Sequence, residues 1–176
     1  IDSVFSQFSE PIAAASIAQV HFAKIKSSNT EIDVAVKVLR PEIEKIINQE
    51  MERLEWLTTF MENFTEFQRL RPNSIIKKAK EVIKFELDLR YEAAAASELS
   101  ENTNMDESFY VPKVYWDKVT QKILTMEKII GVPADKIDEL NEKKVNKKQA
   151  AENLIINFLR QSIRDGYFHA DLHQGN

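Results

Sequence analysis

Two short runs near the start of the chain alternate apolar and polar residues, which is the pattern of half-buried β-strands. The runs are IAQVHFAKI at 17–25 and EIDVAVKVL at 31–39, and the polar segment KSSNTE separates them. Two later runs, YVPKVYWD at 110–117 and KILTMEKI at 122–129, have similar composition. The pattern therefore predicts two pairs of strands, the second pair joined by a short polar turn near Thr120.

Between these pairs, apolar residues recur at helical spacing. One helix is predicted from Glu42 onward, with its apolar positions extending to Phe64. Pro72 forbids its continuation, and Asn73 or Ser74 is available as the N-cap of the next helix. That second helix is predicted to run without interruption through residues 75–93.

The last part of the chain begins at a break, Gly131-Val132-Pro133. A short helix is predicted for ADKIDEL at 134–140, and a strongly amphipathic helix for residues 147–166, ending at Gly166. The order is then strand, loop, two strands, helices, two strands, break, helices and a loop motif. This is the order of a protein-kinase N-lobe followed by the start of its C-lobe.

We therefore predict an α+β, protein-kinase-like fold. Residues 1–130 would form an N-lobe with an antiparallel sheet and inserted helices, and residues 131–176 the truncated start of a helical C-lobe.

Composition excludes several classes of protein. The 176 residues contain no cysteine, which excludes disulfide scaffolds and thiolate metal sites. A net charge of -4 gives no electrostatic reason to expect nucleic acid. No run of about 18 apolar residues occurs, so no bilayer span is expected. The first residue is not methionine and the last lies inside a motif, so we expect a fragment of a longer protein.

The segment PIAAASIAQVH, residues 11–21, has the spacing of the phosphate-loop pattern G-x-G-x-x-G-x-V without any glycine. Ala13, Ala15 and Ala18 fall on the glycine positions and Val20 on the valine. Small side chains let a backbone approach phosphates, but alanine loses the easy access of glycine to positive φ. We expect a loop that is stiffer and more helical than a glycine loop. A turn of small residues between strands explains the segment equally well.

Two further segments could supply an ion pair. VAVK ends at Lys37 and fits the kinase strand whose lysine grips the phosphates, although an edge-strand lysine facing water is the alternative. FELDLRYEAAAAS places Glu86, Asp88 and Glu92 on one predicted helix, with Glu86 and Glu92 on a broad shared face. One glutamate could hold Lys37. A solvated acidic face is the alternative, which the four alanines after Glu92 make less attractive.

The final segment, HADLHQGN, fits H-R-D-L-x-x-x-N at His169, Asp171, Leu172 and Asn176. The aspartate could accept or orient the proton of an acceptor hydroxyl, and the asparagine could reach a metal ion that bridges phosphates. Metal ligation by His169 and His173, or a chance match, are the alternatives.

Together these segments resemble the UbiB family of atypical kinases, which includes the ADCK and yeast coenzyme-Q kinase-like proteins. The matching segments are PIAAASIAQVH, VAVKVLRP, ELDLRYEAAAAS, VPKVYWD and FHADLHQGN, which span nearly the whole chain. Gln174 departs from the family, in which proline is common there. The family's upstream K-x-G-Q segment and downstream D-x-G are absent from this chain.

The resemblance implies a role for each matching residue. Lys37 matches the ATP-gripping lysine and Glu92 its partner, while Glu86 and Asp88 match the E-x-D motif. Asp171 matches the catalytic aspartate and Asn176 the first metal ligand. The resemblance also implies an alanine-rich nucleotide loop, which comprises Ala13, Ala14, Ala15, Ser16, Ala18 and Val20.

The resemblance further implies ATP or ADP and magnesium as ligands, with ATP hydrolysis or phosphotransfer that supports ubiquinone biosynthesis. The implied partners are nucleotide, membrane lipid or isoprenoid-pathway components and other ubiquinone-biosynthesis proteins, but not nucleic acid. The implied location is cytoplasmic, peripheral to the inner membrane of a bacterium, or mitochondrial in a eukaryote. The fragment alone is expected to be inactive. Two rival functions stay open: a small-molecule phosphotransferase of the aminoglycoside or choline kinase type, and a nucleotide-binding pseudokinase scaffold.

Overall fold

The computed structural model describes residues 4–27, 30–168 and 170. Within it the chain packs as two units. The first comprises the residues up to Ala93 together with Tyr115–Met126, and the second comprises Ala94–Val114 together with the residues from Glu127 onward. The lobe boundary expected at residue 130 stays a prediction.

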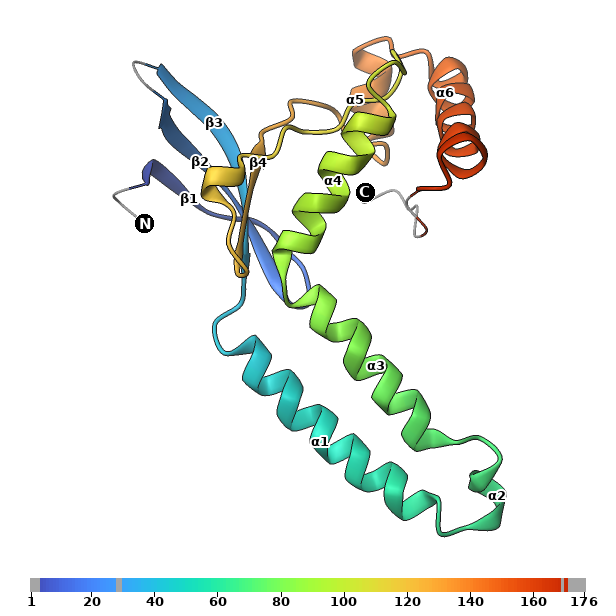
Figure 1. Cartoon of the computed structure of the whole chain (residues 1–176). Helices are drawn as coiled ribbons and strands as arrows, with labels where there is room; N and C mark the ends of the chain where they lie inside the picture. Colours follow the sequence, from blue (N-terminus) through green and yellow to red (C-terminus); the bar gives the residue numbers. More distant parts are fainter. Residues whose placement is uncertain (1–3, 28–29, 169, 171–176) are drawn as a thin grey trace. The chain divides into compact units, whose positions relative to one another are not determined.

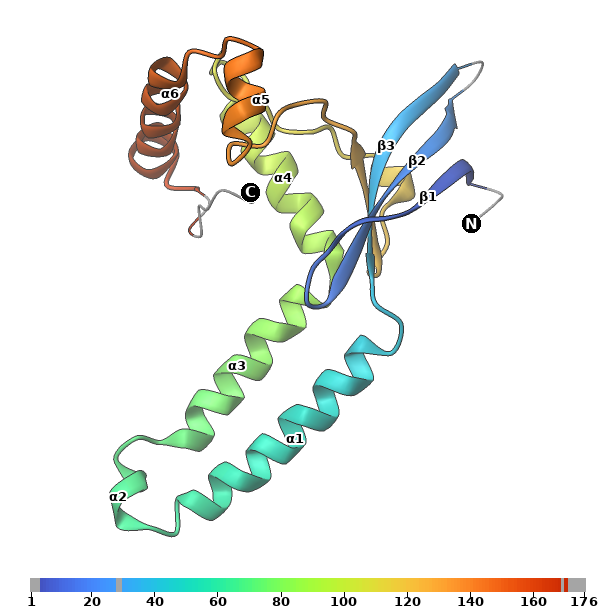
Figure 2. The same ribbon diagram turned by 180° about the vertical axis from the view of Figure 1, so that it is seen from behind.

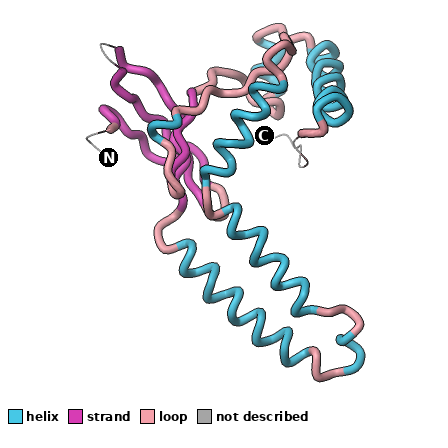
Figure 3. The backbone as a smooth tube through the Cα atoms, viewed as in Figure 1, coloured by secondary structure: helices cyan, strands magenta, loops and turns pink. Residues whose placement is uncertain are grey.

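A four-stranded sheet forms the centre of the first unit (Figures 1 and 3). Its strands are β1 (Phe5–Ala14), β2 (Ala18–Ser27), β3 (Thr30–Leu39) and β4 (Ile123–Glu127), which lie side by side in that order. The β1–β2 and β2–β3 pairs are antiparallel. The predicted α+β class with an antiparallel N-lobe sheet is therefore confirmed, and so are the strands expected at 17–25, 31–39 and 122–129.

One face of this sheet carries the apolar core. Val34 and Val36 of β3 are fully buried and form a cluster with Phe5, Ala23 and Ile25 of the neighbouring strands. Burying each valine stabilises the fold by about 1.5–3 kcal/mol relative to an exposed position. Because successive side chains of a strand point to opposite faces, residues 35 and 37 lie on the other face.

A pair of long helices follows the third strand. They are α1 (Ile43–Met61) and α3 (Pro72–Glu86), which run side by side in opposite directions, with the short α2 (Thr65–Gln68) in the connection between them (Figures 1 and 2). The first helix ends before Phe64, where the apolar pattern would have continued it. The connection is therefore longer than the sequence predicts.

The predicted N-cap of the second helix is wrong. α3 begins at Pro72 and follows Arg71, whose φ is +48°. The side chain of Asn73 is used between helices instead. Its Oδ1 accepts a 2.5 Å hydrogen bond from Thr58 Oγ1, and its Nδ2 donates a 2.7 Å hydrogen bond to Glu62 Oε2. Asn73 thus bonds to α1 and to the residue that follows it, rather than capping its own helix.

The prediction of one uninterrupted helix through residues 75–93 is also wrong, because residues 87 and 88 are not helical and separate two helices. After α3 ends at Glu86, α4 (Leu89–Asn102) begins with Asp88 in the N-cap position. Asp88 Oδ1 accepts the backbone N–H of Arg90 at 3.1 Å, and the N–H of Leu89 donates to Gln121 O at 2.9 Å. These two bonds satisfy donors that a new helix leaves unpaired.

The strand predicted for residues 110–117 does not form. Trp116–Lys118 is a single 3₁₀ turn, and only a bridge at Val114 joins the segment to β4. The Tyr115 N–H donates to Thr125 O at 3.0 Å, and the Glu127 N–H donates to Lys113 O at 2.8 Å. Pro112 has no N–H to give to a ladder. The polar turn near Thr120 is present, with the Thr120 N–H donating to Ile123 O at 2.8 Å.

The second unit contains the two predicted late helices, α5 (Ile137–Glu142) and α6 (Lys147–Leu159). Asn146 caps α6, since its side chain accepts the N–H of Gln149. A wider, π-helical turn at Arg160–Asp165 follows, and Gly166 ends it with a φ of +64°. Gly166 therefore ends the helical segment where the sequence predicts. None of the helices in the described ranges is long and apolar enough to cross a membrane.

We expect Asp88→Ala to loosen the first turn of α4, because the Arg90 N–H loses its side-chain acceptor. The free energy of local opening there should fall by about 1 kcal/mol. Amide hydrogen exchange of Arg90 in the full-length protein measures this. Asp88→Asn keeps an acceptor oxygen and is the matched control. Equal exchange in the alanine variant and in wild type would contradict the capping role.

Candidate functional site in the first unit and its relatives

Three of the predicted nucleotide-binding residues lie in a row across the sheet. Ala13 pairs with Val20 between β1 and β2, and Val20 pairs with Lys37 between β2 and β3. Residues directly opposite one another in antiparallel strands share a face. The row is on the face of β3 opposite to buried Val34 and Val36. The sheet thus brings the alanine segment and the lysine together.

The ammonium of Lys37 is held by Glu92. Its Nζ lies 2.9 Å from Glu92 Oε1 and 2.6 Å from Oε2, and the two side chains are 25% and 43% exposed. An ion pair this open to water adds about 1 kcal/mol or less to stability. Its effect is to fix where the ammonium lies. This is the contact that the sequence analysis predicts, and the role of the pair in binding nucleotide stays a prediction.

Glu92 reaches the lysine because of the helix that carries it. Leu89 and Ala93, on either side of it in α4, are 2% and 0% exposed. These buried neighbours hold the first turn of α4 within the first unit. The full burial of Ala93 agrees with the close packing that the alanine run suggests, although Ala94 is exposed.

Glu86 and Asp88 are not part of this pair. The break between α3 and α4 puts Glu86 at the exposed end of α3, so the face that the sequence predicts it to share with Glu92 does not exist. Asp88 is bound by Arg90, with Nε at 2.9 Å from Oδ1 and Nη2 at 2.6 Å from Oδ2. The hydrogen bond from this guanidinium lowers the pKa of Asp88 below its usual value.

The alanine-rich segment is the end of a β-hairpin. Ala13 and Ala14 are the last residues of β1, Ala15 and Ser16 form the turn, and Ala18 begins β2. The Ala15 N–H donates to Ala18 O at 2.9 Å. The expectation of a more helical loop is therefore wrong. Residues 13–16 are exposed, whereas Ala18 is fully buried and its methyl group packs inside the unit.

This turn needs no glycine. Among the described residues, positive φ occurs at Glu42, Arg71 and Lys144 and at Gly166, none of which lies in the turn. Alanine can therefore occupy the turn without backbone strain. A glycine there would add freedom that the observed conformation does not use.

Arg40 is a site residue that sequence reasoning missed. Its Nε and Nη2 donate to Ala15 O at 3.3 and 3.2 Å, and its backbone N–H donates to Ile17 O at 2.9 Å. It joins the end of the lysine strand to the alanine turn. The available signal was its position, three residues after Lys37 and directly before Pro41.

In the second unit, a buried carboxylate holds the last turn before the HADLHQGN motif. Asp106, 6% exposed, accepts hydrogen bonds from Arg160 at 3.2 Å and from both terminal nitrogens of Arg164 at 3.1 and 2.8 Å. These bonds, chiefly that of Arg164, lower the pKa of Asp106. Arg164 also binds Asp165 and lowers its pKa.

The predicted catalytic and metal-binding residues, Asp171 and Asn176, lie outside the described residues, and so do His169 and His173. No group of three or more His, Asp or Glu side chains that could hold a metal occurs in the part of the chain that the structure describes. The magnesium prediction therefore rests on the sequence. Lys37 is a described residue of the site that could bind phosphate.

Comparison with known proteins identifies the family. The profile of the ABC1 atypical kinase-like domain matches residues 1–176. This chain belongs to the ABC1 atypical kinase-like family. The ABC1 domain is 40% identical over 178 aligned residues to the probable protein kinase UbiB of Pseudomonas paraeruginosa and 41% identical to that of Pseudomonas entomophila. It is 38% identical to that of Aeromonas hydrophila.

These alignments cover 100% of the ABC1 domain and 33%, 33% and 32% of the three relatives in turn. The chain thus spans about a third of the length of the curated relatives it matches. The resemblance to the UbiB family is confirmed.

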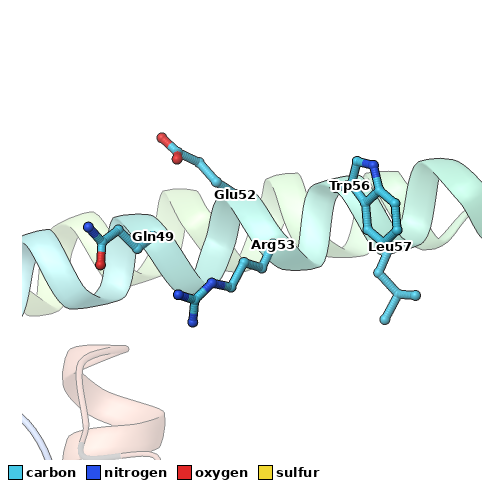
Figure 4. Close-up of a pocket in the computed structure, with 5 residues that line it drawn as sticks. All are labelled: Gln49, Glu52, Arg53, Trp56 and Leu57. Carbon is cyan, nitrogen blue, oxygen red and sulfur yellow. The ribbon is translucent and has the colours of Figure 1, made fainter.

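One hollow on the described surface of the ABC1 domain, of about 470 Å³, has Asp88 of the E-x-D motif in its lining, and another lies on α1. The one on α1 has a volume of about 660 Å³ and is lined by five side chains of that single helix (Figure 4). They are Gln49, Glu52, Arg53, Trp56 and Leu57. Since one helix supplies the whole lining, it is a surface groove between neighbouring side chains. It contains none of the residues in the row across the sheet.

We expect Arg40→Ala to loosen the alanine turn, because Ala15 O loses both guanidinium donors. The free energy of local opening at Ala15 should fall by about 1 kcal/mol. Amide exchange of Ala15 in the full-length protein reports it. Arg53→Ala, which removes an exposed arginine paired with Glu50 on α1, is the control. If both variants exchange like wild type at Ala15, Arg40 does not hold the turn.

Proposed function

We propose that this domain is the nucleotide-binding part of an atypical kinase or ATPase that uses ATP, or ADP, with magnesium. The observation that carries the proposal is the Lys37–Glu92 ion pair on the sheet face that also carries Ala13 and Val20. Membership of the ABC1 family and the name probable protein kinase UbiB of its relatives support it.

In this proposal each residue has a distinct task. The Lys37 ammonium binds the α- and β-phosphates, because a positioned cation offsets their negative charge. Glu92 keeps that ammonium in place both before and while nucleotide is bound. The turn at Ala15 and Ser16 covers the phosphates with a backbone that small side chains leave accessible.

Two residues of the final motif complete the proposed chemistry. Asp171 would orient the attacking hydroxyl or water and accept its proton, and Asn176 would bind magnesium. Bound magnesium would neutralise the charge that develops on the transferred phosphoryl group. Both assignments rest on the H-x-D-L-x-x-x-N spacing.

The wider role is proposed from the UbiB resemblance. The domain would support ubiquinone biosynthesis and work with membrane lipid or isoprenoid-pathway components and with other proteins of that pathway. It would act in the cytoplasm at the inner membrane of a bacterium, or in the mitochondrion of a eukaryote.

Glu92→Gln in the full-length protein tests the proposal. Losing one oriented charge-assisted hydrogen bond to phosphate, worth about 1.5–3 kcal/mol, should weaken ATP and ADP binding by about tenfold or more. Glu55→Gln is the matched control, since Glu55 pairs with Lys80 at 3.2 Å and the two are 33% and 31% exposed.

Asp171→Asn should keep binding but slow magnesium-dependent hydrolysis by about 10²–10⁴-fold.

Calorimetry for binding and phosphate release for turnover, each with magnesium and with EDTA, measure these effects. A wild-type protein that binds neither nucleotide would contradict the proposal. Binding without any turnover would contradict the enzymatic part and favour the scaffold alternative. Undiminished hydrolysis by Asp171→Asn would remove that residue from the mechanism.

The alanine turn generates a separate prediction. Ala15→Gly should alter the ratio of ATP to ADP affinity by about two- to fivefold, because glycine adds about 0.4–1 kcal/mol of backbone freedom to a turn that covers phosphates. Ala134→Gly makes the same change in an exposed turn of the second unit. Should both variants keep the wild-type ratio and rate, the composition of the turn has no part in nucleotide selection.

A further inference from the structure

The contacts between α6 and the chain that follows α4 are polar. Asn157 and Gln161 of the α6 segment are 4% and 5% exposed, whereas Leu159 and Ile163 beside them are 47% and 80% exposed. Asn157 exchanges hydrogen bonds with the side chain of Ser108 and donates to its carbonyl. Within the described residues, hydrogen bonds rather than apolar burial therefore hold this face of the helix.

Asp106 is at the centre of these contacts. Arg160 and Arg164 are four residues apart and lie on the same side of the helix as Asn157. All three side chains bind the segment 102–108. Arg164 Nη2 also donates to Asn102 O at 3.2 Å. Apolar burial is non-directional, but hydrogen bonds require particular distances and angles. Contacts of this kind fix the rotation of the helix end about its axis and its position along that axis, and they also hold it to the segment 102–108.

The chain that leaves this helix is fixed to it in turn. The Tyr167 N–H donates to Gln161 O at 3.1 Å, and the ring of Phe168 packs edge-to-face on Phe158 at 5.6 Å. The wider turn at Arg160–Asp165 is a type of helix defect that is frequent at functional sites. Residue 168 is three positions before Asp171.

We propose that Asp106 is a positioning residue, which through Arg160 and Arg164 sets the location of Tyr167 and Phe168, the two residues that lead into the HADLHQGN motif. The proposal rests on the proposed function, in which Asp171 acts on the phosphoryl acceptor. Asp106 acts through the helix end, and displacement of a reacting group by about 1 Å can cost about 10²-fold in rate.

The test uses the full-length protein with Asp106→Asn, which keeps the size of the side chain but faces the arginines with an amide. Arg164→Lys keeps the charge but cannot bind two carboxylates as a planar fork. Asp117→Asn is the matched control, because Asp117 pairs with Lys118 at an exposed position of the first unit. Three quantities are measured: amide exchange of residues 167–176, kcat for ATP hydrolysis, and Kd for ADP.

We expect exchange of residues 167–176 to become about tenfold faster or more in Asp106→Asn, and less so in Arg164→Lys. The kcat should fall by about tenfold to a hundredfold, with the Kd for ADP within about twofold of wild type. Asp117→Asn should match wild type in all three. A role limited to stability would lower the unfolding temperature without changing kcat or this exchange well below that temperature.

Unchanged exchange and kcat in both variants would overturn the proposal. If Asp106→Asn does not fold, Arg164→Lys alone decides it by the same measurements. A wild-type protein without turnover would contradict the proposed function, while the exchange of residues 167–176 would still show whether Asp106 holds the chain where it leaves the helix end.

Discussion

The candidate site of the first unit depends on one ion pair, between a lysine on the third strand and a glutamate 55 residues later. A cation projecting from a small sheet needs a carboxylate or water. Here the carboxylate comes from the first turn of α4, which begins directly after the break at Asp88. That break is stabilised by Gln121, in the turn that leads into β4. Strand, helix and turn therefore all contribute to the position of one ammonium group.

The alanine-rich turn has less backbone conformational freedom than a glycine-rich loop. A glycine-rich loop can adopt many backbone conformations, and its ordering on binding has an entropic cost. The hairpin here uses conformations that alanine adopts freely, and Arg40 ties its tip to the end of the lysine strand. The turn is thus already ordered beside Lys37, and the ordering comes from local hydrogen bonds rather than from bound nucleotide.

The second unit is held together by a different kind of contact. Its buried side chains include Asp106, Asn157 and Gln161, while much of the apolar side of α6 is exposed. A buried carboxylate is tolerated because three arginine N–H groups satisfy it, and removing both arginines would leave a buried charge without these partners. Directional contacts of this kind give α6 a defined orientation, which apolar packing alone would leave looser.

The sequence by itself determined the elements whose signal is local. Periods of two and of about 3.6 predicted β2, β3, β4, α1 and α6, because burial of one face imposes those periods. Motif spacing selected Lys37 but left Glu86 and Glu92 open as its partner, and the resemblance to the UbiB family selected Glu92. Only the tertiary structure decided the break at Asp88, the link from Asn73 to α1, the loss of a strand at 110–117, and the roles of Arg40 and Asp106. Each depends on hydrogen-bond partners elsewhere in the chain, such as Gln121, Thr58 or Ala15. The spacing of apolar residues within one helix or strand cannot predict such partners.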